Sequence, residues 1–265
     1  MRTILITGST DGIGKLTALK LAKQGHQMLL HGRDSEKLAD TILAIKDQTG
    51  NAKISGFVSD LSDFSSIEKM VVDISSEFTS IDVLINNAGI FISRIEQNQD
   101  NLDIRFAVNY LAPYLLTKGL LPLLKNSNSP RIINLSSAAQ STVSMDALAG
   151  KVQISSNAAY AQSKLALTMW SFALAKANPE IVTIAVNPGS LLNTKMALEA
   201  YGQHWSSADK GANVLCELAM SDQYADSNGK YFDNDIGSFS HAHNDAYNEE
   251  KIDQLISETS KILKK

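Results

Sequence analysis

The stretch TILITGSTDGIGKLTALKLAKQG, residues 3–25, decides the fold of this chain. It opens with a strand-length apolar run, Thr3–Thr7, and then turns at Gly8, Gly12 and Gly14. In the segment that follows, apolar residues recur every three to four positions, and Gly25 is a typical helix stop. A strand, a glycine-rich turn and a helix in this order predict the first unit of an open α/β sheet.

The three glycines have separate tasks in such a turn. Gly8 allows the tight turn itself, whereas Gly12 and Gly14 let the backbone approach a pyrophosphate and let the helix pack on the strand. The helix N-terminus adds unpaired N–H groups and a partial positive charge. The stretch therefore predicts a dinucleotide-binding site; a turn with incidental glycines is the alternative interpretation.

Short apolar runs and longer helical patterns alternate along the rest of the 265 residues. Further strands are expected at His26–Gly32, Lys53–Asp60, Asp82–Gly89, Arg131–Ser137, Val182–Gly189 and Gly229–Asp235. Helices are expected at Ser35–Gly50, Asp63–Phe78, about Leu102–Lys125, around Tyr160 and near Glu249–Leu263. The alternation predicts one α/β domain over residues 1–265, with a single Rossmann-type, doubly wound, mainly parallel sheet of about seven strands and helices on both faces.

The composition argues against several classes of protein. A formal net charge of -4 and the lack of a basic stripe speak against a nucleic-acid partner. The lone cysteine, Cys216, cannot form an internal disulfide, which fits a reducing compartment. Neither a signal peptide nor an apolar run of the ~20 residues that span a membrane is visible, so the expected location is the cytoplasm. His241 and His243 lack an obvious acidic partner shell, and no metal is expected.

Polar residues gather where the predicted strands end, which is where open parallel sheets bind ligands. They lie at Thr7–Gly14, Gly32–Asp34, Asp60, Asn86–Gly89, Ser136–Ser137 and Pro188–Thr194. In addition, the helical pattern AAYAQSKLAL, Ala158–Leu167, carries Tyr160 and Lys164 one turn apart on the same helix face. The pair alone is weak evidence, because many helices carry such a pair on their surface.

Five motifs occur in the order in which the short-chain dehydrogenases/reductases have them, and the sequence resembles that family from about residue 3 to residue 195. The motifs are TGSTDGIG at 7–14, NNAG at 86–89, NLSS at 134–137, YxxxK at 160–164 and NPG at 187–189. Asn109, in FAVNYLAP, matches the helix-borne asparagine of the family. The resemblance implies a Rossmann fold and hydride transfer with a nicotinamide cofactor.

The resemblance also implies catalytic roles for four residues. Tyr160 is the acid/base, Lys164 lowers its pKa and binds the nicotinamide ribose, and Ser137 holds the substrate carbonyl oxygen, with Ser136 as the alternative. Asn109 binds a water that links Lys164 to solvent. The chemistry supports this pairing, because a free tyrosine has a pKa of ~10 and a nearby ammonium favours the phenolate.

The cofactor-binding residues that the resemblance implies come from every part of the predicted sheet edge. They are Gly8, Ser9, Asp11, Gly12, Ile13, Gly14, Arg33, Asp60, Leu61, Asn87, Ala88, Gly89, Tyr160, Lys164, Pro188, Gly189 and Thr194. Asp60 matches the adenine-contacting aspartate, with a helix cap as the alternative. Thr194 would face the carboxamide, although its distance from Gly189 is one residue longer than the commonest family spacing.

The end of the second strand, LLHGRDSEKL, bears on the choice of dinucleotide. Arg33 is the first charged residue after the strand, and a guanidinium forms charge-assisted, bidentate bonds with a ribose phosphate. We therefore expect NADP as the cofactor. NAD is the alternative, because Asp11 stands where many NADP users have a basic residue and Asp34 either caps the next helix or reaches the ribose.

Three loops, residues 90–101, 138–156 and 189–207, are expected to build the substrate pocket. Their apolar residues are Phe91, Ile92, Met145, Leu148, Leu191, Leu192, Met196, Leu198, Tyr201 and Trp205. The interval between Ser137 and Tyr160 is longer than in compact family members and resembles the retinol-dehydrogenase-like and monomeric carbonyl-reductase-like branches. Because of this insertion, the sequence does not decide between a monomer and a homo-oligomer.

These observations predict an oxidoreductase that transfers a hydride between a nicotinamide, NADP in preference to NAD, and a largely apolar small-molecule carbonyl or alcohol substrate. A non-catalytic, dinucleotide-sensing protein on the same scaffold is the alternative. Such proteins usually lack the tyrosine or the lysine, and this chain has both.

Overall fold

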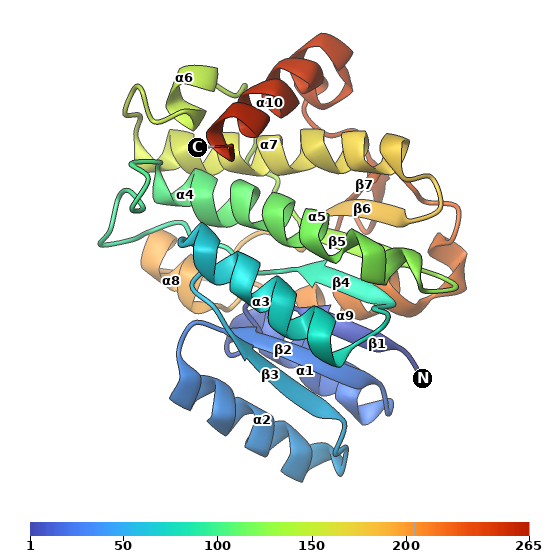
Figure 1. Cartoon of the computed structure of the whole chain (residues 1–265). Helices are drawn as coiled ribbons and strands as arrows, with labels where there is room; N and C mark the ends of the chain where they lie inside the picture. Colours follow the sequence, from blue (N-terminus) through green and yellow to red (C-terminus); the bar gives the residue numbers. More distant parts are fainter. Residues whose placement is uncertain (204, 265) are drawn as a thin grey trace.

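The computed structural model describes residues 1–203 and 205–264, and within them an eight-stranded sheet forms the centre of the molecule (Figure 1). Its order is β3-β2-β1-β4-β5-β6-β7-β8. The strands are β1 (Thr3–Ile6), β2 (Gln27–Gly32), β3 (Ile54–Val58), β4 (Val83–Asn86), β5 (Arg131–Leu135), β6 (Val182–Asn187), β7 (Lys230–Asp233) and β8 (Ser238–Ser240). All neighbours pair in parallel except β7 and β8, so the predicted doubly wound, mainly parallel sheet is confirmed.

The sheet has one strand more than the seven that could be placed from the sequence, close to the predicted number of about seven. The additional strand, β8, is antiparallel to β7 and closes one edge of the sheet. It has only three residues, Ser-Phe-Ser, and is too short for an alternating pattern to be recognised. Its register is fixed by packing, because the ring of Phe239 contacts Phe232 and Tyr224 edge-on.

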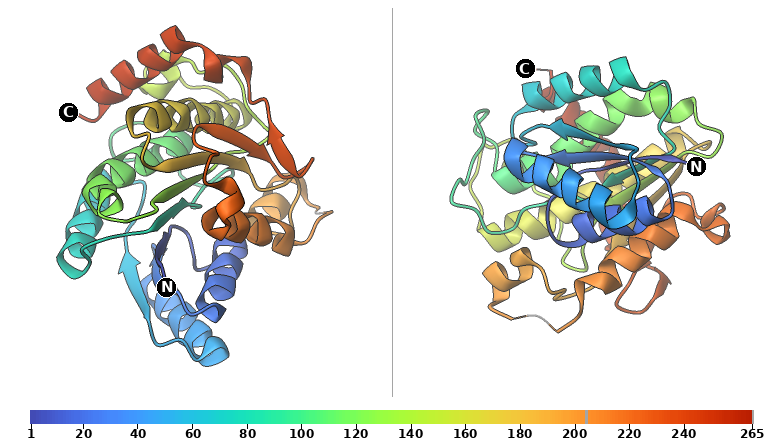
Figure 2. Two further views of the ribbon diagram at one scale, coloured as in Figure 1. Left: turned by 90° about the vertical axis from the view of Figure 1, so that its right-hand side faces the viewer. Right: turned by 90° about the horizontal axis from the view of Figure 1, so that it is seen from below.

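Helices cover both faces of the sheet, as Figure 2 shows from two further sides. One face is covered by α3 (Phe64–Glu77), α5 (Ala112–Lys125) and α7 (Ser156–Ala177), and the other by α1 (Gly12–Lys23), α2 (Ser35–Thr49) and α9 (Ala208–Met220). The alternation of β1 explains how two cores form: Leu5 packs with the first set of helices, and Ile4 and Ile6 pack with the second.

The long helix predicted from about Leu102 to Lys125 is present, but its first part is irregular. It begins as α4 (Ile104–Phe106), passes through a π-helical segment at Ala107–Leu111 and continues as α5. Isolated π-turns inside α-helices are rare and occur frequently at functional sites. This one contains Asn109, which the sequence analysis had singled out.

The C-terminal helix α10 (Glu249–Ile262) lies over α7, beside the short helix α6 (Met145–Leu148) of the insertion (Figures 1 and 2). Ala147 and Leu148 are buried in the core below, and Met145 packs against it. These residues of the insertion therefore contribute to the hydrophobic core, although the sequence analysis had assigned Met145 and Leu148 to the substrate pocket. None of the helices in the described part of the chain has the length and apolar character that a membrane span requires.

The hydroxyl pair Tyr110–Thr259 ties α10 to the domain, and its removal provides a test of this packing. The two side-chain oxygens are 2.7 Å apart and both residues are fully buried. We expect Thr259→Val to lower the free energy of unfolding by about 1–3 kcal/mol in urea denaturation, because the Tyr110 hydroxyl loses its partner. Tyr110→Phe should lower the free energy of unfolding less in the Thr259→Val variant than in the native chain. In the double variant no buried hydroxyl of this pair is left without its partner. Strictly additive losses would contradict the pairing.

Candidate active site

Two adjoining cavities lie at the carboxyl ends of the strands. The turn cavity, about 430 Å³, runs from Gly32, Arg33 and Asp60 past the glycine turn to Tyr160 and Lys164. The loop cavity, about 680 Å³, lies between the segment after β5 and the loop after β6. Residues common to both cavities are Ile13, Phe91, Ser136, Tyr160, Pro188, Thr194 and Met196. Two compartments with a shared wall suit two ligands that meet there.

The glycine turn is held in shape by contacts that exclude larger residues. Gly8 has φ +63°, and a Cβ there would lie 2.9 Å from the Cα of Ala88. The Asn87 amide nitrogen donates hydrogen bonds to the carbonyls of Thr7, at 2.8 Å, and Gly8, at 3.0 Å. A Cβ on Gly14 would collide with this same amide and with the Gly8 carbonyl. NNAG therefore fixes the turn as well as lining the cavity.

Asp11 begins α1 and carries a charge close to the proposed anion site. Its carboxylate caps the helix by accepting the Gly12 N–H at 2.8 Å and forms an ion pair with Lys37 at 2.7 Å. The hydrogen bond from Lys37 lowers the pKa of Asp11, so that carboxylate stays ionised. Lys37 thus offsets the negative charge that Asp11 brings to the helix N-terminus.

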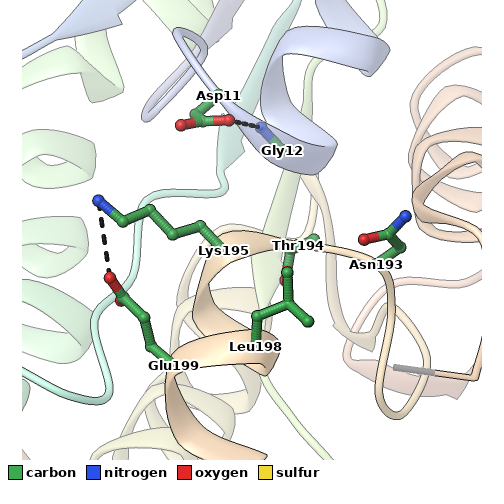
Figure 3. A pocket seen from close by; sticks show the side chains of 7 residues that line it. All are labelled: Asp11, Gly12, Asn193, Thr194, Lys195, Leu198 and Glu199. Atoms are coloured by element: carbon green, nitrogen blue, oxygen red, sulfur yellow. Dashed lines mark hydrogen bonds and ion pairs between the residues drawn. The ribbon is translucent and has the colours of Figure 1, made fainter. Parts of the chain in front are cut away.

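A smaller pocket of about 410 Å³ separates the glycine turn from α8 (Lys195–Tyr201). Figure 3 shows Asp11 and Gly12 on one side of this pocket, and Thr194, Lys195 and Glu199 opposite. Thr194 is the N-cap of α8 and accepts a hydrogen bond from the Ala197 N–H at 3.3 Å. The loop and helix after β6 therefore form the outer wall of the site, and Thr194 also lines the turn cavity.

The residues that follow β2 and β3 line the far end of the turn cavity. Arg33, Asp60 and Leu61 all contribute to its surface. Asp34 instead caps α2, because its carboxylate accepts the Lys37 N–H at 2.9 Å. Asp60 does not cap α3; its carboxylate accepts hydrogen bonds from both the backbone and the hydroxyl of Ser62.

Ser9 and Asn109 lie behind the cavity walls. Ser9 is fully buried, and its hydroxyl bonds to the backbone of β2. The Asn109 amide group donates to the carbonyl of Ile90, at 2.9 Å, and to the hydroxyl of Ser163, at 2.9 Å, and its oxygen accepts the Ile90 N–H at 2.7 Å. Asn109 therefore clamps the start of the 90–101 loop to α7, and the predicted water would have to bind elsewhere than on its amide N–H groups.

The two serines after β5 differ sharply in environment. Ser136 is 3% exposed, and its hydroxyl bonds to Thr168 at 2.7 Å and to the Lys164 carbonyl at 3.1 Å. Ser137 is half-buried and lines the loop cavity, and its carbonyl accepts a 3.0 Å hydrogen bond from the Tyr231 hydroxyl. Of the two, Ser137 is the better placed to meet a ligand, and Ser136 anchors the strand end to α7.

Tyr160 and Lys164 lie on the cavity side of α7. Tyr160 forms part of the wall shared by both cavities, and its ring stacks on Phe91 with centroids 4.4 Å apart. The Lys164 Nζ lies 5.7 Å from the centroid of that tyrosine ring and donates a 2.7 Å hydrogen bond to the Leu135 carbonyl. Burial lowers the pKa of Lys164 to about 8. A buried ammonium that donates to a carbonyl and lies next to a phenol is an arrangement suited to proton transfer.

The loop cavity is mostly apolar. Among the residues that the sequence analysis assigned to a pocket, Phe91, Leu191, Leu192, Met196 and Trp205 line it. Ile92 lines the turn cavity and Leu198 the small pocket, and the side chain of Tyr201 lies outside the described part of the structure.

Sequence reasoning missed three features that shape these cavities. Lys37 and His31 line the turn cavity from α2 and β2, and their place beside the end of the second strand was the available signal. Asp235 follows β7 and accepts hydrogen bonds from Ser190 and Asn187, which fixes the loop after β6. No spacing in the sequence pointed to this long-range contact. Within the described residues, His, Cys, Asp and Glu side chains form no group of three or more that suits a metal ion.

Comparison with known proteins identifies a matching family model, similar sequences and a similar solved structure. The family model described as short chain dehydrogenase matches residues 2–204 of the chain. Human retinol dehydrogenase 13 is 33% identical over 252 residues, which cover 88% of this chain and 76% of that protein. Human polyprenol dehydrogenase is 36% identical over 203 residues, covering 73% and 61%, respectively. A crystal structure of an Escherichia coli CFT073 protein, described as a short chain dehydrogenase complexed with NADPH, has a TM-score of 0.74 at 26% identity and covers 88% of this chain and 96% of that one.

The burial of Lys164 leads to a prediction about the free energy of unfolding and its dependence on pH. The pKa of Lys164 in the folded protein lies below the ~10.4 of an unfolded lysine. Burial of the charged form therefore destabilises the fold fully below pH 8, and this loss of stability disappears as the pH rises above ~10.4. We expect Lys164→Met to raise the free energy of unfolding at pH 7 by roughly 1–3 kcal/mol, with a smaller gain at pH 10. Urea denaturation at both pH values measures this, with the exposed Lys118→Met as control. A variant less stable than the native chain at pH 7 would show that the ammonium is not a net cost.

Proposed function

The chain belongs to the short-chain dehydrogenase family, and from this premise we propose that it is an NADP-dependent oxidoreductase that interconverts an apolar alcohol and its carbonyl compound. The observation that carries the proposal is the position of Tyr160. It stands in the wall common to the turn cavity and the loop cavity, beside the buried ammonium of Lys164. A proton donor at this boundary is able to serve a substrate in one cavity while a cofactor fills the other.

The turn cavity fits a dinucleotide in shape and charge. Arg33 and Lys37 at its far end supply cations for a ribose phosphate, and the start of α1 supplies backbone N–H groups for the pyrophosphate. At the near end, a Cβ on Gly89 would lie 3.3 Å from both the Asn109 oxygen and the Lys164 nitrogen, so only glycine leaves this space open. When bound, NADP supplies the hydride acceptor, and NADPH the donor.

The proposed proton chemistry uses three side chains. The Tyr160 hydroxyl gives a proton to the carbonyl oxygen in reduction and takes one from the alcohol in oxidation. The positive charge of Lys164 favours the phenolate form in the second direction. The Ser137 hydroxyl donates a hydrogen bond to the same substrate oxygen and so orients it. Because the Ser136 hydroxyl is engaged with Thr168, we assign it no contact with the substrate.

The walls of the loop cavity support the proposed substrate class. Leu191, Leu192, Met196 and Trp205 offer few hydrogen-bonding groups, which favours a substrate with a largely apolar body. The names of the two relatives, a retinol and a polyprenol dehydrogenase, support an apolar alcohol or its carbonyl counterpart.

Replacement of Tyr160 by Phe tests the acid/base assignment. The ring and its stacking on Phe91 remain, but the exchangeable proton is lost. We expect kcat with a responsive aldehyde, ketone or alcohol to fall at least ~100-fold. The Kd for NADPH, measured by fluorescence titration, should stay within about twofold of the native value, since 1 kcal/mol already changes Kd about fivefold. Ser136→Ala, as a control, should retain most activity. Near-normal turnover in the Tyr160 variant would refute its role as the acid/base.

Replacement of Arg33 by Ala tests the choice of NADP. A charge-assisted bond to a phosphate contributes ~1.5–3 kcal/mol, so the variant should lose at least about tenfold in kcat/KM for NADPH and little for NADH. Steady-state kinetics with both cofactors measure the effect, and Lys118→Ala on α5 controls for loss of a surface charge. Equal losses for the two cofactors, or a native preference for NADH, would remove Arg33 from the phosphate site.

A further inference from the structure

His31 occupies an unusual position at the floor of the turn cavity. It lies one residue before the end of β2 and is only 3% exposed, yet it lines the cavity together with Gly8 and Ser59. It has no place in the proton chemistry proposed above, and among the described residues it lines the turn cavity but not the loop cavity. A buried, polar ring in a ligand-binding cavity requires hydrogen-bond partners, and these partners define what the ring does.

Both ring nitrogens of His31 are engaged by backbone groups of neighbouring segments. The Gly8 N–H lies 3.0 Å from Nδ1, and the Ser59 carbonyl oxygen lies 2.9 Å from Nε2. Because the first partner is a donor and the second an acceptor, only one protonation state satisfies both contacts. Nδ1 must be unprotonated and Nε2 must carry the proton. The ring is therefore a neutral bridge between the glycine turn and the end of β3.

The backbone of His31 holds the same turn from a second side. Its carbonyl accepts the Ser9 N–H at 3.0 Å, and its own N–H donates to the Ser9 hydroxyl at 2.9 Å. Burial lowers the pKa of His31, against the opposing effects of the Ser59 carbonyl and the charge of Asp60, which keeps the ring neutral near pH 7. Gly8 and Ser9 are thus both fixed by this one residue.

The Gly8 N–H contact has a direct consequence for the shape of the site. Gly8 is confined on its other side by Ala88, and its φ of +63° is the conformation that starts the turn. Without an acceptor at Nδ1, the part-buried Gly8 N–H would have to find another partner, and Gly8 itself lines the turn cavity. A rotated peptide there would change the backbone surface that receives the dinucleotide.

We propose that His31 is a positioning residue for the dinucleotide, which holds the glycine turn in its binding shape by accepting the Gly8 N–H at Nδ1. The proposal rests on the function proposed above for the turn cavity. It assigns to a β2 side chain a task that the glycine motif is unable to perform by itself. It also explains why a titratable side chain is kept neutral at a place where no proton transfer takes place.

A matched pair of variants separates this role from a general loss of stability. Asparagine places an oxygen acceptor about where Nδ1 lies, whereas leucine has nearly the same size and shape without an acceptor. Both variants lose the contact with Ser59, so both should unfold at a lower denaturant concentration. We expect His31→Asn to bind NADPH within about threefold of the native protein and His31→Leu to bind about tenfold more weakly or worse, as loss of one buried acceptor implies. Equal Kd values for the two variants would overturn the proposal.

A measurement without cofactor distinguishes failure of this proposal from failure of the proposed function. In ¹⁵N NMR of the ligand-free protein at pH 7, His31 should show a protonated Nε2 and an unprotonated Nδ1. The Gly8 amide should exchange slowly in the native protein and in His31→Asn, but rapidly in His31→Leu. A proton on Nδ1, or a Gly8 amide unaffected by either change, would refute the role of His31 even if NADPH binds. Should His31→Leu not fold, the ring tautomer and the His31→Asn affinity still decide the question.

Discussion

The hydrogen bonds from Asn87 to the carbonyls of Thr7 and Gly8 are the contact on which the rest of the molecule depends. They join the ends of β1 and β4, the pair of strands at which the order of the sheet reverses. In open α/β sheets this reversal opens a crevice, because the connections on its two sides run in opposite directions. One amide side chain thus links the two halves of the sheet where they meet, and it also lines the turn cavity.

The site around this crevice contains several polar side chains that are buried in the folded protein. Lys164 is 4% exposed, and among the described residues its ammonium group donates one hydrogen bond, to the Leu135 carbonyl. Asn109, Ser136 and His31 are also buried, but each has its hydrogen-bonding groups matched to backbone or hydroxyl partners. The matched groups maintain the geometry, whereas the weakly compensated ammonium is the group to which we assign a role in the proposed proton transfer.

The sequence was sufficient to predict the parallel sheet, its helical layers and the gathering of polar residues at one edge, because apolar periodicity and glycine turns are local signals. It also identified Asp34 as a cap candidate, and the carboxylate of Asp34 does cap α2. The short edge strand β8 and the core role of Leu148 were not predictable in this way, since packing partners distant in the chain determine both. The contacts of His31 with Gly8 and Ser59 were invisible for the same reason. The roles of the site residues themselves remain predictions.

The contact between Tyr110 and Thr259 joins residues 149 positions apart and has a consequence for how the protein is made. A ribosome completes α5 and α7 well before it reaches α10, so the aromatic cluster of Tyr110, Tyr114 and Trp170 is made before the helix that contacts Tyr110. During that interval the nascent chain exposes an apolar face that chaperones and other nascent chains are able to bind. The formation of α10 therefore determines when this apolar face becomes covered and is no longer available for aggregation.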